Sequence, residues 1–204
     1  AKAAHHAYGA PRMGVMGTPP QIDFPAVKAH VAGVIDGIAP NDSIARFEAL
    51  GVTVISEHAA FTGPREAASK HHKVRAKYFV IASGSQPAIP PIDGLSDIDF
   101  YTNETIFADP AKPDHLVIIG GGPIGIEMAQ AHVRLGVDVT VIEALSVMAR
   151  DDSELVTMLK TQLEADGVKF IEGVSVTSVR QNQPNDITLT LANGTVIGAS
   201  HLLR

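Results

Sequence analysis

A glycine-rich turn after a short apolar run is the feature that most constrains how this chain can fold. Residues 116–119 form a continuous apolar run, which is typical of a parallel strand covered on both faces. The run ends at Gly120, Gly122 and Gly125, which have the spacing GxGxxG and precede a helical pattern. In such a turn the first glycine permits a tight reversal, the second lets main chain approach a pyrophosphate, and the third allows close helix–strand packing. The spacing therefore predicts a strand, a turn and a helix arranged around the phosphates of a dinucleotide.

The start of the predicted helix favours the same role. Pro123 suits the first helical position, because its ring presets φ and its missing N–H would have had no partner inside the helix. We expect the N–H groups of Ile124 and Gly125 to remain free and, with the helix dipole behind them, to face an anion. The helix is expected to end near Gly136, a residue common after the last turn of a helix.

An acidic residue follows at the end of the next apolar run. Residues 137–142 predict a second strand, and Glu143 stands close to the spacing of about 20 residues expected for the acid that binds the adenosine ribose. A carboxylate accepts hydrogen bonds from a 2′-hydroxyl and repels a 2′-phosphate, so the sequence favours NAD over NADP. Arg150 could bind a 2′-phosphate if its loop folds back.

The composition limits the kinds of partner that the protein can bind. Acidic residues outnumber basic ones by 22 to 16 in 204 residues and no basic block stands out, so we expect neither nucleic acid nor a membrane as a partner. No charge-free apolar stretch of about 18 residues occurs, which predicts a soluble protein. The chain has no cysteine, which removes disulfides and thiol chemistry from these residues without marking a compartment. We predict a cytoplasmic location.

Nine histidines raise the question of a metal site, with adjacent pairs at His5-His6 and His71-His72. Adjacent side chains on a helix do not share a face, and no acidic partner follows at a spacing of three or four residues. We therefore expect no metal site and interpret the pairs as solvated surface or loop.

The two ends of the chain suggest an internal piece of a longer protein. The chain opens with a helical composition over residues 1–8 and no initiating Met. It closes on an apolar strand pattern at residues 199–204, and a complete dinucleotide fold needs more parallel strands than we find after Glu143.

Capping residues predict two helices in the first quarter of the chain. Asp23 can cap a helix over residues 24–38. Asn41 or Asp42 is expected to start another, which Gly51 ends. The apolar face of the first helix consists of Val27, Val31, Val34 and Ile35.

The rest of the chain alternates predicted strands and helices. A short helix is expected from Thr102, a longer one over residues 153–166, and an antiparallel meander after residue 176 with its turn at Asn193-Gly194. Pro87 to Gly94 is a proline-rich connection. The further predicted strands are 52–56, 58–62, 78–82, which we expect to be buried, and 168–171.

Three motifs in order identify a family resemblance. They are EHAAFT at residues 57–62, YFVIASGSQP at residues 78–87 and GGGPIGIE at residues 120–127. Together they resemble the FAD-dependent pyridine nucleotide-disulfide oxidoreductases, and among these the dihydrolipoamide dehydrogenase and mercuric reductase-like proteins.

The resemblance implies an α/β fold, with Rossmann-like three-layer nucleotide-binding folds, a parallel sheet and an antiparallel β-meander in two partial domains. Residues 1–101 would be the later part of an FAD-binding domain and residues 102–204 an NAD-binding domain. The intact protein would be a homodimer that passes hydride from NADH to FAD and on to a disulfide or related small-molecule acceptor. The fragment alone is expected to be inactive. The alternatives are a family member without a redox disulfide, such as a transhydrogenase or NADH oxidase, and a non-catalytic NAD-binding module.

The same resemblance implies roles for further residues. Main chain at His58 and Ala59 would contact the FAD adenine, and Glu127 would help to position the nicotinamide against the flavin. The other residues expected close to FAD are Ala82, Ser83 and Gly84.

Overall fold

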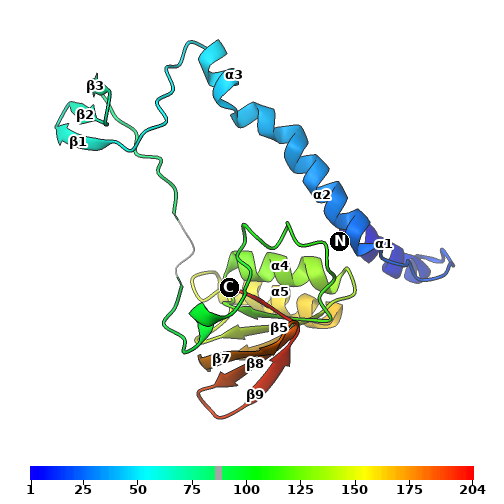
Figure 1. Cartoon of the computed structure of the whole chain (residues 1–204). Coiled ribbons are helices and arrows are strands. Elements are labelled where there is room, and N and C mark those ends of the chain that lie inside the picture. The colour runs from blue at the N-terminus through cyan, green and yellow to red at the C-terminus, as the bar shows by residue number, and fades with distance from the viewer. Residues whose placement is uncertain (86–88) are drawn as a thin grey trace. The chain divides into compact units, whose positions relative to one another are not determined.

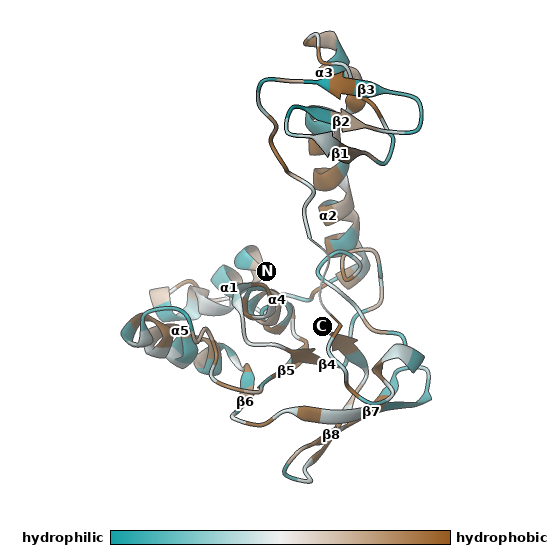
Figure 2. Ribbon diagram, turned by 90° about the vertical axis from the view of Figure 1, so that its left-hand side faces the viewer, coloured by the Kyte–Doolittle hydropathy of each residue, from teal (hydrophilic) through white to brown (hydrophobic). Residues whose placement is uncertain are grey.

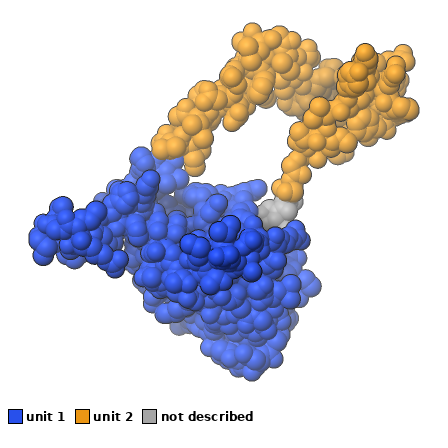
Figure 3. Space-filling model, turned by 180° about the vertical axis from the view of Figure 1, so that it is seen from behind, with its two compact units in different colours: residues 1–32, 87–204 blue, residues 33–86 orange. Residues whose placement is uncertain are grey.

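The computed structural model describes residues 1–85 and 89–204 (Figure 1). Two compact units are present, one of residues 33–86 and one of residues 1–32 with 87–204 (Figure 3). The division at residue 101 inferred from sequence stays a prediction. Gln86 and Pro87, at the end of the second motif, and the first residues of the proline-rich connection lie outside the described residues.

A parallel four-stranded sheet forms the centre of the larger unit. Its strands lie in the order β10-β4-β5-β6, and every neighbouring pair is parallel. Two helices connect β4 to β5 and β5 to β6, which is the repeating unit of a Rossmann-like fold. The α/β prediction is therefore confirmed. The elements are β4 His115–Ile119, α4 Pro123–Val133, β5 Asp138–Glu143, α5 Ser153–Asp166, β6 Lys169–Glu172 and β10 His201–Leu203.

Each face of this sheet is covered by a different layer. Leu116 and Ile118 of β4 pack with the residues of α4 and α5, whereas Val117 between them packs with the antiparallel meander. This alternation follows from the two-residue period of a strand. Figure 1 shows the helices on one side of β5 and the meander on the other, and Figure 2 shows the apolar ribbon of β4 and β5 between them. The meander consists of β7 Val176–Gln183, β8 Asp186–Leu191 and β9 Val196–Ala199.

Local signals at the ends of the predicted elements are mostly confirmed. The Asp152 carboxylate accepts hydrogen bonds from the first turn of α5, at 2.9 Å from the Glu154 N–H, and Gly167 ends that helix with φ +108°. Asn193 accepts from the Thr195 N–H at 3.0 Å in the predicted hairpin turn. α4 ends at Val133, before the predicted Gly136, because the chain tightens into a turn there.

The amino-terminal helices agree with the sequence pattern in part. Asp23 accepts a hydrogen bond from the Ala26 N–H at 3.0 Å, as predicted, and Phe24 is buried. Val34 and Ile35 of the predicted apolar face are exposed. The second helix is capped by Ser43, not by Asn41 or Asp42, which lie in a preceding 3-10 turn. The elements are α1 Lys2–Gly9, η1 Ala10–Met13, α2 Phe24–Ile38, η2 Ala39–Asp42 and α3 Ile44–Ala49.

The described part of the smaller unit, residues 33–85, contains a small antiparallel sheet made of β1 Ala60–Gly63, β2 Glu66–Ala68 and β3 Lys73–Arg75. The strands predicted at 52–56 and 78–82 are not formed, and the predicted burial of the second is wrong, since Val80 is 90% exposed. A parallel strand needs a neighbour for its N–H and C=O groups, and no described strand pairs with either segment.

Two segments before β4 differ from simple expectation. The helix predicted from Thr102 is only a succession of turns, although the Thr102 hydroxyl does accept from the Glu104 N–H at 3.2 Å. A short 3-10 helix, η3 Leu95–Asp97, buries Leu95 against the meander. In the part of the chain that is described, no helix is long and apolar enough to cross a membrane.

Candidate nucleotide-binding site

The predicted glycine turn lies at the carboxyl end of β4. Gly120 has φ +118°, which side chains disfavour, and its N–H donates to the Ile142 carbonyl at 2.9 Å. Gly122 is the N-cap of α4 and Pro123 is in its first turn. Within the described residues no side chain caps this helix, so the N–H groups of Ile124 and Gly125 have no side-chain acceptor. The first N–H groups of α4 are therefore available to a ligand at the end of β4.

The glycines of the turn differ in the space around them. A Cβ at Gly125 would lie 2.1 Å from the Gly120 carbonyl oxygen, so the helix can begin this close to the strand only with glycine there. A Cβ at Gly122 would meet nothing within 4 Å, which leaves the main chain open to a ligand. Gly121, which the motif leaves free, is also restricted, because a Cβ would lie 2.9 Å from Cγ2 of Val147.

The acid at the end of β5 holds the turn. Glu143 Oε2 accepts a hydrogen bond from the Gly121 N–H at 2.7 Å, and its Oε1 accepts from the Leu145 N–H at 3.0 Å. A carboxylate has about four lone-pair sites, so these two bonds leave acceptor capacity for a ligand hydroxyl. The geometry places Glu143 where the sequence predicted a ribose-binding acid, and that role stays a prediction.

A cavity of about 590 Å³ opens beside these groups. Gly120, Gly122 and Glu143 line it, together with residues 90–92 and 174–176. It lies at the carboxyl ends of β4 and β5, where open parallel sheets bind ligands. Arg150 is not among the lining residues. Arg204, which sequence reasoning did not single out, is among them.

The loop after β5 is held by a second acid. Glu172 of β6 accepts from the Val147 N–H at 2.7 Å and forms an ion pair with Lys160 of α5. Partial burial acts to raise the pKa of Glu172, but Lys160 and the Val147 N–H outweigh it and lower the pKa below its usual value. Val147 is thereby fixed against Gly121, which stabilises the floor of the turn.

Glu127 lies apart from this cavity. It is exposed on α4 and lines a separate groove of about 520 Å³ with His5 and His6 of α1 and with Arg134. Arg134 itself forms an ion pair with Asp166 of α5 at 2.8 Å. The expected contact of Glu127 with a nicotinamide stays a prediction.

The residues expected near FAD lie in the unit of residues 33–86. His58 and Ala59 precede β1 and are exposed. The segment of Ala82, Ser83 and Gly84 is exposed as well, and Gly84 has φ +68°. The rings of Phe61 and Phe79 meet edge to face, 5.0 Å apart, and so bring the two motifs together.

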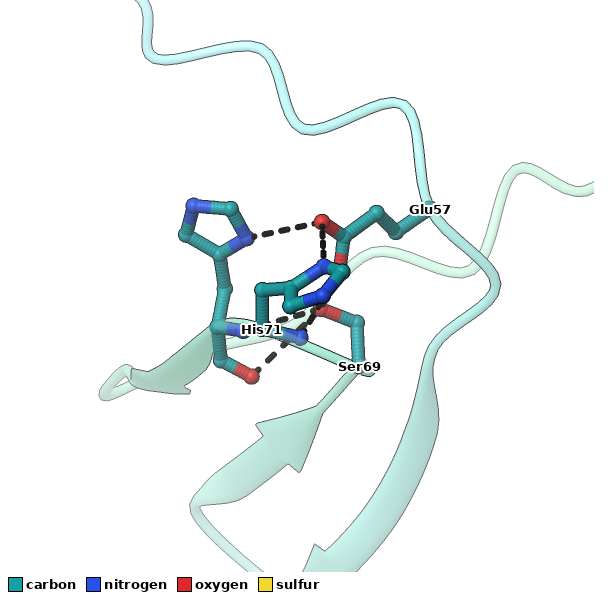
Figure 4. A network of polar contacts seen from close by, with 4 residues as sticks. Glu57, Ser69 and His71 are labelled. Carbon is teal, nitrogen blue, oxygen red and sulfur yellow. Dashed lines mark hydrogen bonds and ion pairs between the residues drawn. The ribbon is translucent and has the colours of Figure 1, made fainter.

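Sequence reasoning also missed the hydrogen bonds that Glu57, just before β1, accepts. Glu57 accepts from the Ser69 hydroxyl at 2.5 Å and from the His71 N–H at 3.1 Å, and its other oxygen lies 3.0 Å from Nδ1 of His71 (Figure 4). These bonds, with Ser69 contributing most, lower the pKa of Glu57 to about 2. His72 Nδ1 lies 3.2 Å from the same carboxylate. Nowhere in the described ranges do three His, Asp or Glu residues form a group that could hold a metal ion.

A second polar cluster lies under α4 in the larger unit. The Tyr101 hydroxyl donates to Asp109, and Lys28 of α2 donates to the Ile106 carbonyl. His132 of α4 is buried beside them, 6.3 Å from the Phe24 ring, with Nδ1 2.8 Å from the Met128 carbonyl oxygen. Burial is the main cause that lowers the pKa of His132. The contact of Phe24 with His132 joins α2 to α4.

The strand order and the connecting helices define a class: an α/β protein with a Rossmann-like nucleotide-binding fold. A family model described as "Pyridine nucleotide-disulphide oxidoreductase" matches residues 14–203. Because this match covers most of the chain, the chain belongs to the pyridine nucleotide-disulphide oxidoreductase family. The resemblance inferred from the three motifs is confirmed.

Two relatives agree with this assignment, and a solved structure shares the fold. A mercuric reductase from Streptomyces lividans is 31% identical over 214 residues, which cover 100% of this chain and 44% of that protein. A dihydrolipoyl dehydrogenase from Thermus scotoductus is 28% identical over 90% of this chain and 40% of that protein. The solved structure of the HOCl-induced flavoprotein disulfide reductase RclA from Escherichia coli has a TM-score of 0.77 at 23% identity, covering 98% of this chain and 44% of RclA. The chain thus spans less than half the length of these relatives.

Proposed function

We propose that this segment binds the NAD of an NADH-dependent, FAD-containing disulfide oxidoreductase in the cavity beside Gly120 and Glu143. The observation that carries the proposal is the open face of Gly122 at an uncapped helix N-terminus, with the Glu143 carboxylate across the same cavity. The three features match the parts of a dinucleotide: main chain for the diphosphate and an acid for the ribose.

Each residue would act by binding and orienting. The N–H groups of Ile124 and Gly125 would donate to the diphosphate, and Glu143 would accept from a ribose hydroxyl while it keeps the Gly121 N–H. A 2′-phosphate in place of that hydroxyl would face a carboxylate, which is the physical reason to propose NADH over NADPH.

The unit of residues 33–86 would contribute to FAD binding through His58, Ala59, Ala82, Ser83 and Gly84. Support comes from the Phe61–Phe79 contact, which joins the two segments, and from the exposure of these residues. When bound, the two cofactors supply the hydride chemistry, whereas protein groups supply orientation and electrostatics. Glu127 would help to position the nicotinamide from α4.

The intact protein would pass the electrons to a disulfide or a small-molecule acceptor, and would work as a cytoplasmic homodimer. These points rest on the family assignment.

The test uses the full-length protein purified without added cofactor. The proposal expects a yellow protein whose flavin band bleaches when NADH is added without oxygen, and bleaches less readily with NADPH. A colourless protein that still binds NADH would instead favour a non-catalytic NAD-binding module. A yellow protein that NADH neither binds nor reduces would contradict the proposed site.

A further inference from the structure

The carboxyl end of β10 places an arginine over the glycine turn. Leu203 pairs with Ile118 in the parallel sheet, so Arg204 follows beside the end of β4, where Gly120 begins the turn. Nη1 of Arg204 lies 3.5 Å from the position that a Cβ on Gly120 would occupy. The guanidinium therefore lies against the one residue at which the chain reverses into the helix N-terminus.

The main chain of Arg204 is fixed on both sides. Its N–H donates to the Tyr101 carbonyl at 2.8 Å, and the Tyr101 N–H donates to the Leu202 carbonyl at 2.8 Å. On the other edge, β10 pairs with β4. Such bracketing limits the directions that the side chain can take, because the positions of its Cα and Cβ are set by two neighbours.

One hydrogen-bond donor of the Arg204 side chain has no acceptor among the described residues. Its Nε is buried and has no hydrogen-bond partner in residues 1–85 and 89–204. None of the ion pairs found in those same ranges includes Arg204. A buried polar group without a partner is rare in native proteins. The described residues therefore offer no acceptor for this Nε–H, which leaves the donor available to a ligand in the cavity.

The cavity identifies the chemistry of that group. Arg204 lines the same cavity as Gly122 and Glu143, and β10 lies on the opposite side of β4 from β5. The chain order therefore reverses between β4 and β10, which is the kind of crevice in which open α/β sheets bind ligands. A planar guanidinium binds two oxygens of one phosphate group well.

We propose that Arg204 is a binding residue for the diphosphate of the dinucleotide, on the β10 side of the glycine turn. The inference rests on the proposed NAD site and extends it. The helix N-terminus and Arg204 would hold the diphosphate from two sides, while Glu143 on β5 holds the ribose. Arg204 lies next to Gly120 at the β4–β10 end of the cavity, so its target is the diphosphate and not a 2′-phosphate beside Glu143.

The experiment compares variants of the full-length, flavin-loaded protein. Arg204→Met removes the charge and keeps much of the side-chain length, and Arg204→Lys keeps the charge without the planar fork. Arg180→Met is the matched control, because Arg180 is an exposed arginine on β7 that does not line the cavity. The probes are ADP-ribose, NADH and NADPH, with dissociation constants measured by calorimetry and the flavin spectrum recorded as a check of folding.

We expect Arg204→Met to weaken ADP-ribose and NADH equally, by about 10-fold to 100-fold, as for the loss of a hydrogen bond to a charged group. Arg204→Lys should recover part of that loss, and Arg180→Met should stay within about twofold of the parent. Rising salt should weaken the parent more than Arg204→Met.

Two results would overturn the inference while leaving the proposed function in place. One is binding of ADP-ribose by Arg204→Met as tightly as by Arg180→Met. The other is a loss confined to NADPH, which would assign Arg204 to a 2′-phosphate. A parent protein that binds neither ADP-ribose nor NADH would refute the NAD site itself. If Arg204→Met loses its flavin spectrum, Arg204→Lys decides: a folded Lys variant with parental affinity for all three probes counts against a role for the planar fork.

Discussion

The Glu143 carboxylate accepts a hydrogen bond from the Gly121 N–H at 2.7 Å, and so joins the end of β5 to the turn after β4. A side chain expected to bind a ribose therefore also holds the main chain that is expected to bind the diphosphate. The two parts of the site are coupled, because a change at Glu143 alters the turn as well as the ribose contact. Val147 packs against the same turn, because its Cγ2 lies 2.9 Å from the position that a Cβ on Gly121 would occupy.

Exchanging the charge of that acid should change cofactor preference. Glu143→Arg removes the repulsion of a 2′-phosphate and offers it a cation, so we expect the NADH preference of the parent to narrow or reverse. The measurement is the ratio of the NADH and NADPH dissociation constants. Glu164→Arg, on the exposed face of α5, is the control and should leave the ratio unchanged. Equal affinities in the parent would refute the ribose argument.

Two single-methyl substitutions in the turn should affect different properties, one the stability of the fold and the other the affinity for NADH. Gly125→Ala puts a Cβ 2.1 Å from the Gly120 carbonyl oxygen, and we expect it to lower the free energy of unfolding by about 1–3 kcal/mol. Gly122→Ala meets no protein atom within 4 Å, so the thermal midpoint should change little while NADH affinity falls. Thermal unfolding and NADH titration of both variants check this. A Gly122→Ala protein with parental NADH affinity would argue against close approach of a ligand there.

The lowered pKa of Glu57 predicts that the stability of the small sheet depends on pH. The hydrogen bonds of Ser69 and His71 lower the pKa of Glu57 from 4.5 to about 2. A lowered carboxylate pKa stabilises the folded form above the ordinary value, and that stabilisation is lost as the pH falls from 4.5 towards about 2. Glu57→Gln should therefore speed hydrogen exchange at the His71 N–H at neutral pH, and the difference from the parent should shrink in acid.

The control for this experiment is Glu48→Gln, which changes an exposed acid on α3. It should leave exchange at His71 as in the parent. Equal exchange rates in the parent and in Glu57→Gln at neutral pH would show that the carboxylate does not order the turn between β2 and β3.

Buried His132 predicts a second loss of stability on acidification, in a pH range above that of Glu57. Its pKa lies below the usual 6.5, first because of burial and further because of Lys28 and His201, while the Met128 carbonyl acts in the opposite direction. The unfolded chain therefore takes up a proton near 6.5 that the folded protein does not, so stability falls as the pH drops below 6.5. The free energy of unfolding, measured with denaturant below pH 6.5, should change less with pH in His132→Leu than in the parent. His30→Leu, an exposed position on α2, is the control and should keep the parental slope.

Features governed by near neighbours in the chain were predictable from sequence. The apolar run, the glycine spacing and Pro123 set the turn after β4, and Asp152 and Gly167 set the ends of α5. In each case the partner groups lie within a few residues, so composition and spacing carry the information. Ser43 shows the limit of this reasoning, because the sequence offered neighbouring capping residues and the structure uses the one nearest the helix.

Features that need distant partners were not predictable in the same way. The apolar run at 78–82 was expected to be a buried strand, but burial depends on neighbouring strands, and none pairs with it in the described chain. The sequence did not indicate that Glu57 accepts hydrogen bonds from Ser69 and His71, which lie 12 and 14 residues further along the chain. Likewise, β10 alone does not reveal that Arg204 lies against Gly120.

The sequence by itself determined a glycine turn between two parallel strands, the helix that follows it and the acid that ends the second strand, because hydrogen bonding and steric limits within short segments fix these elements. Only the tertiary structure decided that β10 lies beside β4, that the meander covers one face of the sheet, and that the Arg204 guanidinium lies against Gly120. Those relationships depend on which surfaces pack together across long separations in the chain, and no local pattern encodes that choice.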